Sequence, residues 1–125
     1  MQLTERKNIL YVEDLIDAYE LVEVLLFDVY KVLGAKNKED AVNMLQSNQI
    51  DLILMDINLQ RPFDGVELAM QLKEDQLYKN IPIIAVTAYA MEDDKRKIIN
   101  AGMDDYISKP VTKDQLLRKI ANFIN

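Results

Sequence analysis

The chain has 125 residues, of which 50% are hydrophobic, and its 21 acidic and 15 basic side chains give a formal net charge of −6 at pH 7. This length fits one domain over residues 1–125 with its own core, and the acidic balance argues against nucleic-acid binding, which needs clustered Lys and Arg. Cysteine and histidine are absent, which excludes disulfides, Ser-His-Asp catalysis and Cys- or His-ligated metals, so a bound metal would need oxygen ligands.

The N-terminal part of the chain alternates between apolar runs and a helical pattern. Residues 9–12 (ILYV) predict a strand that ends at Glu13 and Asp14. Residues 30–35 predict a second, weaker strand. Between them, apolar residues recur at helical spacing: Ala18, Leu21, Val22, Leu25 and Leu26. This segment therefore predicts two strands joined by a helix.

The next helix and strand follow the same pattern. Asn37 is the expected N-cap of a helix whose apolar positions are Ala41, Val42 and Leu45. Residues 52–55 (LILM) predict a fully buried strand that ends at Asp56. After a polar loop, Gly65 introduces a helix with apolar positions at Val66, Leu68, Ala69 and Leu72.

A further buried strand is predicted for residues 83–86 (IIAV), with Pro82 at its entry and Thr87 at its exit. Residues 91–101 predict a helix, which Gly102 is expected to end in the C-cap role.

The C-terminal part of the chain completes the alternation. Residues 106–107 predict a short fifth strand that ends at residues 108–110 (SKP). The last helix is predicted from Leu116, Leu117, Ile120 and Ile124. Five strands alternating with five helices predict an α/β fold, a doubly wound (βα)5 sandwich around a five-stranded parallel sheet. Ligands of such folds bind beyond the carboxyl ends of the strands.

Polar residues stand at four of the predicted strand ends: Glu13, Asp14, Asp56, Thr87 and Lys109. Three neighbouring carboxylates repel one another unless a cation is present, and Mg²⁺ prefers such oxygen ligands. Lys109 adds a fixed positive charge, so the edge could neutralise a phosphoryl group. Asp56 would then be the nucleophile, and Thr87 could donate its hydroxyl hydrogen to a phosphoryl oxygen.

These residues lie in segments that resemble the receiver domain of two-component response regulators. The matching segments, in chain order, are ILYVED, DLILMDINL, DG, IPIIAVTA and AGMDDYISKP. Any one of them is a weak signal, but all five in order, at family-like spacing, are specific. The resemblance covers essentially the whole chain and implies a flavodoxin-like receiver fold.

The resemblance implies a role for each residue of the acidic cluster. Asp56 matches the aspartate that takes a phosphoryl group from the phosphohistidine of a partner kinase. Asp14 matches a direct Mg²⁺ ligand, and Glu13 a ligand that acts largely through water. Asn58 matches the position whose backbone carbonyl completes the metal site, and its side chain is expected to be dispensable. Mn²⁺ is a possible substitute for Mg²⁺.

The resemblance also implies a phosphoryl pocket and a switch. Thr87 and Lys109 match the hydroxyl and the lysine of the phosphoryl-binding pocket, and the small Ala88 keeps access to that pocket open. Tyr106 matches an aromatic switch residue that moves inward together with Thr87. The bond before Pro110 matches a peptide bond that is usually cis in this family.

The loop after Asp56 departs from the family pattern. Gln60 stands where a proline is common, and Asp64 and Gly65 lie one position further from Asp56 than usual. The loop at residues 60–63 is therefore expected to be one residue longer, with consequences for phosphotransfer rate or partner fit.

The implied partners are proteins. A histidine kinase or phosphotransfer protein would be the donor. A downstream target would bind the face formed by the fourth helix, fifth strand and fifth helix, where Lys95, Ile99 and Tyr106 lie. Direct nucleic-acid and membrane binding are not expected. The first residues (MQLTERKN) lack the apolar run of a signal peptide, and no apolar segment is long enough to span a bilayer, so a cytoplasmic location is expected.

Alternative functions remain open. A haloacid-dehalogenase-type phosphohydrolase would carry a second aspartate where this chain has Asn58, so a signalling domain is favoured over an enzyme. A flavin or nucleotide module would need glycine at the first strand–helix turn, where residues 13–17 hold three acids. A receiver-like scaffold that is never phosphorylated is the third alternative. Met1 and the lack of a linker after Ile124 favour a stand-alone regulator over a receiver excised from a hybrid kinase.

Overall fold

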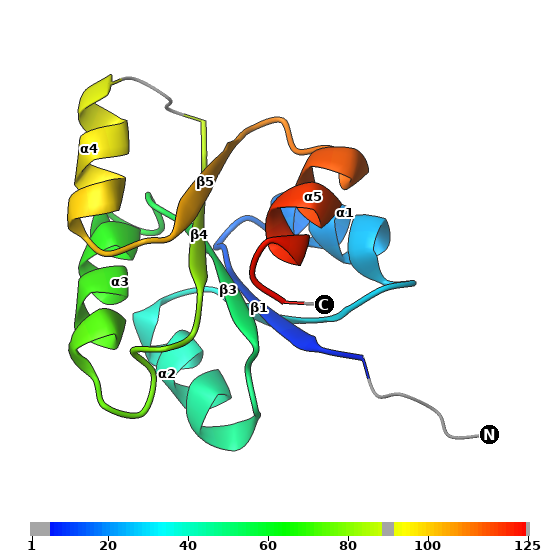
Figure 1. Ribbon diagram of the computed structural model, residues 1–125, viewed down its shortest axis with the longest axis horizontal. Helices are drawn as coiled ribbons and strands as arrows, with labels where there is room; N and C mark the ends of the chain where they lie inside the picture. The colour runs from blue at the N-terminus through cyan, green and yellow to red at the C-terminus, as the bar shows by residue number, and fades with distance from the viewer. Residues whose placement is uncertain (1–5, 89–91, 125) are drawn as a thin grey trace.

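The computed structural model describes residues 6–88 and 92–124, which form one parallel sheet of five strands in the order β2-β1-β3-β4-β5 (Figure 1). The strands are β1 (Asn8–Val12), β2 (Lys31–Ala35), β3 (Leu52–Asp56), β4 (Ile83–Thr87) and β5 (Asp105–Ser108). The helices that alternate with them are α1 (Ile16–Leu26), α2 (Lys38–Ser47), α3 (Asp64–Glu74), α4 (Glu92–Asn100) and α5 (Lys113–Ala121). This confirms the predicted α/β fold with a doubly wound, flavodoxin-like parallel sheet.

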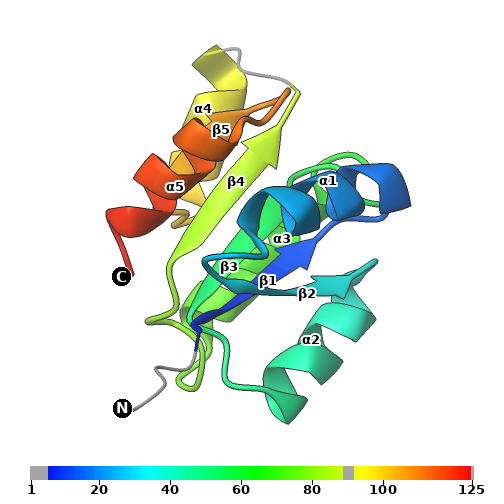
Figure 2. The same ribbon diagram turned by 90° about the vertical axis from the view of Figure 1, so that its right-hand side faces the viewer.

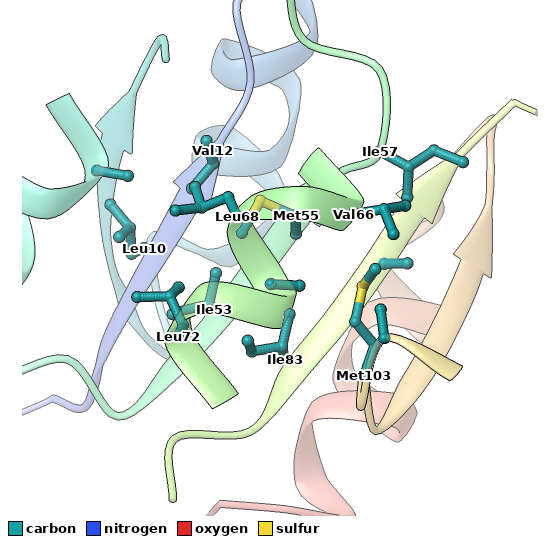
Figure 3. Close-up of a cluster of buried hydrophobic side chains, with 14 of the residues drawn as sticks. Leu10, Val12, Ile53, Met55, Ile57, Val66, Leu68, Leu72, Ile83 and Met103 are labelled. Atoms are coloured by element: carbon teal, nitrogen blue, oxygen red, sulfur yellow. The ribbon is translucent and has the colours of Figure 1, made fainter. Parts of the chain in front are cut away.

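The sheet has a hydrophobic core on each face, because successive residues of a strand point to opposite sides. Leu10 and Val12 of β1 lie on the face that α2, α3 and α4 cover, together with Ile53, Met55 and Ile83 (Figure 3). The intervening Ile9 and Tyr11 lie on the other face, which α1 and α5 cover (Figure 2). Both faces are buried, and the strands therefore read as continuous apolar runs in the sequence.

The strand order places the switch point of the doubly wound sheet between β1 and β3. Strands β1 and β3 are neighbours in the centre, with Val12 paired to Met55. Helix α1, which follows β1, packs on one face, whereas α3, which follows β3, packs on the other. The two loops therefore diverge beyond the carboxyl ends of these strands, at the place where ligands bind in doubly wound folds.

Two predicted helix caps are confirmed. The Asn37 Oδ1 atom accepts a hydrogen bond of 2.8 Å from the backbone N–H of Asp40, which satisfies a free donor in the first turn of α2. Gly102 follows α4 with a φ of +86°, in the left-handed region that glycine adopts without strain. Its N–H donates to the carbonyl of Ile99, as expected of a C-cap.

The helices differ in detail from what the sequence predicted. Leu21 lies in α1, as its spacing predicted, but it is 46% exposed and does not belong to the core. Helix α5 ends at Ala121, before Ile124, although Ile124 still packs against the core beneath α1 and α5. Met91, the expected start of α4, lies outside the described residues.

Among the described residues, no helix is long and apolar enough to cross a membrane.

Candidate functional site

The carboxyl ends of β1 and β3 bring three carboxylates together. Asp56 is the last residue of β3, and Glu13 and Asp14 follow the last residue of β1. One oxygen from each of the three lies within 4.8 Å of the others. A set of closely spaced carboxylate oxygens matches the ligand preference of Mg²⁺ and Mn²⁺, so the residues present fit a hard divalent cation.

Lys109, which directly follows β5, is held against this acidic cluster. Its Nζ atom lies 2.9 Å from Oε1 of Glu13 and 3.7 Å from Oδ2 of Asp56. The backbone N–H of Lys109 donates to the carbonyl of Thr87, which fixes the start of the β5–α5 loop, and the Lys109–Pro110 peptide bond is cis. The lysine therefore contributes a positioned cation to the cluster.

Glu13 is buried and has several partners. It accepts a hydrogen bond of 3.1 Å from the hydroxyl of Tyr11 in addition to the bond from Lys109. Burial alone would raise the pKa of Glu13, but hydrogen bonds with Asp56 and Lys109 hold that pKa below its ordinary value. Glu13 is therefore the member of the cluster that keeps its negative charge most readily.

Asp56 shows the opposite shift. Burial, the hydrogen bond with Glu13 and the charge of Glu13 raise the pKa of Asp56 to about 7, against the opposing effects of the Asn58 N–H and Lys109. Burial and the proximity of Glu13 also raise the pKa of Asp14. Without a cation, the cluster therefore retains a proton near neutral pH, and a divalent ion would displace it.

The loop between β3 and α3 is held by two side chains that bond to its backbone. The carboxylate of Asp64, at the start of α3, accepts hydrogen bonds from the N–H groups of Leu59, Gln60 and Arg61 at 2.7–3.1 Å. Asn58 donates its own N–H to Oδ1 of Asp56 at 3.0 Å. These bonds fix the loop next to the acidic cluster. No role was expected for Asp64, although an acid directly before Gly65 was a usable signal.

The Asn58 side chain, which was expected to be dispensable, has a partner within the loop. Its Oδ1 atom accepts a hydrogen bond of 2.8 Å from the N–H of Phe63. Phe63 has a φ of +61°, a left-handed conformation that is uncommon for a residue with a side chain. The Asn58 amide therefore helps to hold an unfavourable backbone conformation in place.

Replacing Asn58 by alanine is expected to lower the free energy of unfolding by about 1 kcal/mol, because the Phe63 N–H loses its acceptor. The backbone carbonyl of residue 58 is retained in this variant. Urea unfolding of the Asn58→Ala and Asn58→Asp variants would measure the effect. Asp retains the acceptor and is expected to recover most of the loss at high salt. An unchanged unfolding midpoint for alanine would contradict the structural role.

Gly65 allows the first turn of α3 to approach β3 closely. A Cβ atom at this position would lie 1.9 Å from the backbone oxygen of Asp56 and 2.8 Å from Cα of Ile57. The Gly65 N–H donates to the carbonyl of Ile57 at 3.1 Å. The absence of a side chain at Gly65 therefore sets the distance between the helix and the acidic strand end.

The remaining predicted site residues lie on β4 and β5. Thr87 is buried as the last residue of β4, and the small Ala88 beyond it is exposed. Tyr106 on β5 is half-buried, and the Nζ atoms of Lys95 and Lys119 lie 5.3 and 5.5 Å from its ring centroid. Thr87 therefore lies at the same sheet edge as the acidic cluster, whereas the ring of Tyr106 contacts Lys95 of α4 and Lys119 of α5.

Comparisons with known proteins agree with this geometry. Residues 9–121 match the response regulator receiver domain family. The chain is 36% identical over 95 residues to the polar-differentiation response regulator DivK of Brucella anthropi, and the match covers 76% of each chain. Its fold is similar to that of a CheY-like response regulator receiver domain protein from Methanospirillum hungatei, with a TM-score of 0.82, 31% identity and coverage of 94% and 93%.

A second solved structure bears on the metal. It is the receiver domain of the sensor histidine kinase PA1611 from Pseudomonas aeruginosa, with a TM-score of 0.85, 30% identity, and coverage of 97% of this chain and 98% of that one. That receiver has a magnesium ion coordinated in its active-site cleft.

Proposed function

Because this chain belongs to the response regulator receiver domain family, we propose that it is the phosphoacceptor of a two-component pathway, with Asp56 as the acceptor. The donor would be the phosphohistidine of a histidine kinase or of a phosphotransfer protein. The single observation that carries the proposal is the convergence of three carboxylates with Lys109 at the carboxyl edge of the sheet.

A divalent cation is part of the proposal. The carboxylates of Glu13, Asp14 and Asp56 and the backbone carbonyl of Asn58 would hold Mg²⁺, with Mn²⁺ as an alternative. When bound, the ion would supply positive charge that neutralises the phosphoryl oxygens and the acidic cluster. The close spacing of the three carboxylate oxygens supports this assignment.

The side chains and backbone around Asp56 would each have a role in phosphoryl transfer. A carboxylate oxygen of Asp56 attacks the phosphorus as the P–N bond to the donor imidazole breaks, and the electron pair stays on the imidazole nitrogen. The Asn58 N–H orients the acceptor through Oδ1 of Asp56. Lys109 lies near Oδ2 and would stabilise the negative charge on the transferred group. The exposed, small Ala88 would leave the approach to the acceptor open.

We also propose how phosphorylation would be passed on to a partner protein. A phosphoryl group on Asp56 would attract the Thr87 hydroxyl, and Tyr106 would follow, which would change the face formed by α4, β5 and α5. This face carries an apolar side chain suited to a protein partner, since Ile99 is 65% exposed. We propose that the chain acts by contact with proteins, not as an enzyme with a free substrate, and that it does so in the cytoplasm.

Mass spectrometry of the intact protein tests the proposal. Incubation with a small acyl phosphate and Mg²⁺ is expected to add one phosphoryl group, and peptide mapping is expected to place it on Asp56. Chelation of the divalent ion should abolish the gain, because Glu13, Asp14 and Asp56 would then repel the anionic donor. No gain with Mg²⁺, followed by no gain with a phosphorylated histidine phosphotransfer protein as donor, would favour the scaffold that is never phosphorylated.

A further inference from the structure

Phe63 joins the acidic site to helix α4 in a way that the proposed function does not use. Its backbone N–H is held by the Asn58 side chain, two residues after Asp56. Its aromatic ring lies beneath Lys97 of α4, whose Nζ atom is 3.9 Å from the ring centroid. The β3–α3 loop and α4 are thus connected by a cation–π contact.

The backbone conformation of Phe63 indicates that the contact with Lys97 is stabilising. A φ of +61° is the left-handed region, where glycine is the favoured residue and a bulky side chain is strained. Phe63 accepts this conformation at the end of the loop that is expected to be one residue longer than usual. Three interactions offset the strain: the Asn58 bond to its N–H, the packing of its side chain against the core, and the Lys97 contact with its ring.

We propose that Phe63 is a positioning residue that couples the metal-binding loop to helix α4 through Lys97. The inference rests on the proposed function, which assigns the Asn58 carbonyl to the metal site. The Phe63–Lys97 contact would hold the loop in the conformation that presents this carbonyl. Because coupling between sites is reciprocal, metal binding at the loop would also favour the present position of α4.

Charge alone predicts the opposite result for a variant of Lys97. Removing a positive charge near an acidic site should tighten binding of a divalent cation. Loss of the proposed contact should instead weaken Mg²⁺ binding. Without the contact the loop is less ordered, so part of the binding free energy is used to order it. The two explanations therefore differ in the sign of the change.

Calorimetric titration of the metal-free protein with Mg²⁺ tests the proposal. Lys97→Met is expected to weaken Mg²⁺ binding by about two- to five-fold, and Lys97→Arg to restore it, because Arg also binds aromatic faces. Phe63→Leu keeps apolar bulk without an aromatic face, and adding Lys97→Met to it should cause no further weakening. Arg96→Met removes an equal charge from the neighbouring, exposed position of the same helix and is the matched control, with unchanged or slightly tighter binding expected.

A second readout does not depend on the metal. In the metal-free protein, amide hydrogen exchange at residues 58–63 is expected to be faster in Lys97→Met than in Arg96→Met. Equal or tighter Mg²⁺ binding by Lys97→Met, or equal weakening by both variants, would overturn the proposal. If wild type bound no Mg²⁺ and gained no phosphoryl group, the proposed function would fail instead, so the two failures are distinguishable.

Discussion

Metal-free Asp56→Asn is expected to be more stable than wild type by roughly 2–4 kcal/mol at pH 8, and to match wild type near pH 4. The reason is the raised pKa of Asp56, about 7 in the folded protein against an ordinary 3.8. The folded state therefore binds a proton more tightly than the unfolded state between these values. Hence the unfolding free energy of wild type falls as pH rises from about 4 to about 7 and then levels off.

The other members of the cluster do not obscure this window. The pKa of Glu13 is lowered, so its contribution is present above its ordinary value of 4.5 and is lost only as pH falls below it. The pKa of Lys109 is raised from 10.5, and its contribution is lost only at higher pH still. The fall in stability across neutral pH is therefore assigned to Asp56, with Asp14 acting in the same direction.

Urea unfolding of both proteins from pH 4 to pH 8, without divalent ions, measures this difference. The exposed Asp17→Asn substitution is the control, with the pH dependence of wild type expected. Asp56→Asn should also lose the phosphoryl gain, so one substitution would raise stability and abolish the chemistry. If wild type and Asp56→Asn show the same pH dependence, the carboxylates do not crowd one another as the structure places them.

The residues at the strand ends could be predicted because they depend on simple patterns. Unbroken apolar runs fix where β3 and β4 end, so Asp56 and Thr87 follow directly from the sequence. Parallel strands then carry these residues to one edge of the sheet. The pairing of Lys109 with Glu13 spans 96 positions, and only the fold class made their meeting predictable.

The interactions within the β3–α3 loop could not be predicted in this way. The bonds that Asp64 makes to three backbone N–H groups depend on how the loop turns, and no periodic pattern encodes that path. The left-handed conformation of Phe63 is equally hidden, because the usual signal for it is glycine. The exposure of Leu21 has a different reason: helical spacing identifies candidate apolar positions but does not show which of them faces the sheet.

Stability and function make opposing demands at this site. Burial raises the pKa of Asp56, and the same crowding of Asp56 with Glu13 and Asp14 creates an oxygen-rich site for a cation. Without a bound cation, the three carboxylates lower the stability of the fold. The hydrophobic cores on the two faces of the sheet supply the stability that offsets this loss. We therefore expect substitutions that alter the packing of the backbone next to the cluster to be strongly destabilising.

Gly65→Ala is expected to test that packing most severely, with a loss of at least about 3 kcal/mol in unfolding free energy. Alanine normally stabilises a helix relative to glycine, so the expected sign is opposite to that of helix propensity. The added Cβ would lie 1.9 Å from the backbone oxygen of Asp56, and only a shift of α3 or β3 can relieve that contact. Gly34→Ala is the matched control: its Cβ would meet the Tyr19 ring at 2.7 Å, which a side-chain movement can relieve. A larger loss of unfolding free energy in urea for Gly65→Ala than for Gly34→Ala, together with slower acyl-phosphate labelling of Gly65→Ala alone, would support this account. Equal losses of unfolding free energy for the two variants would contradict it.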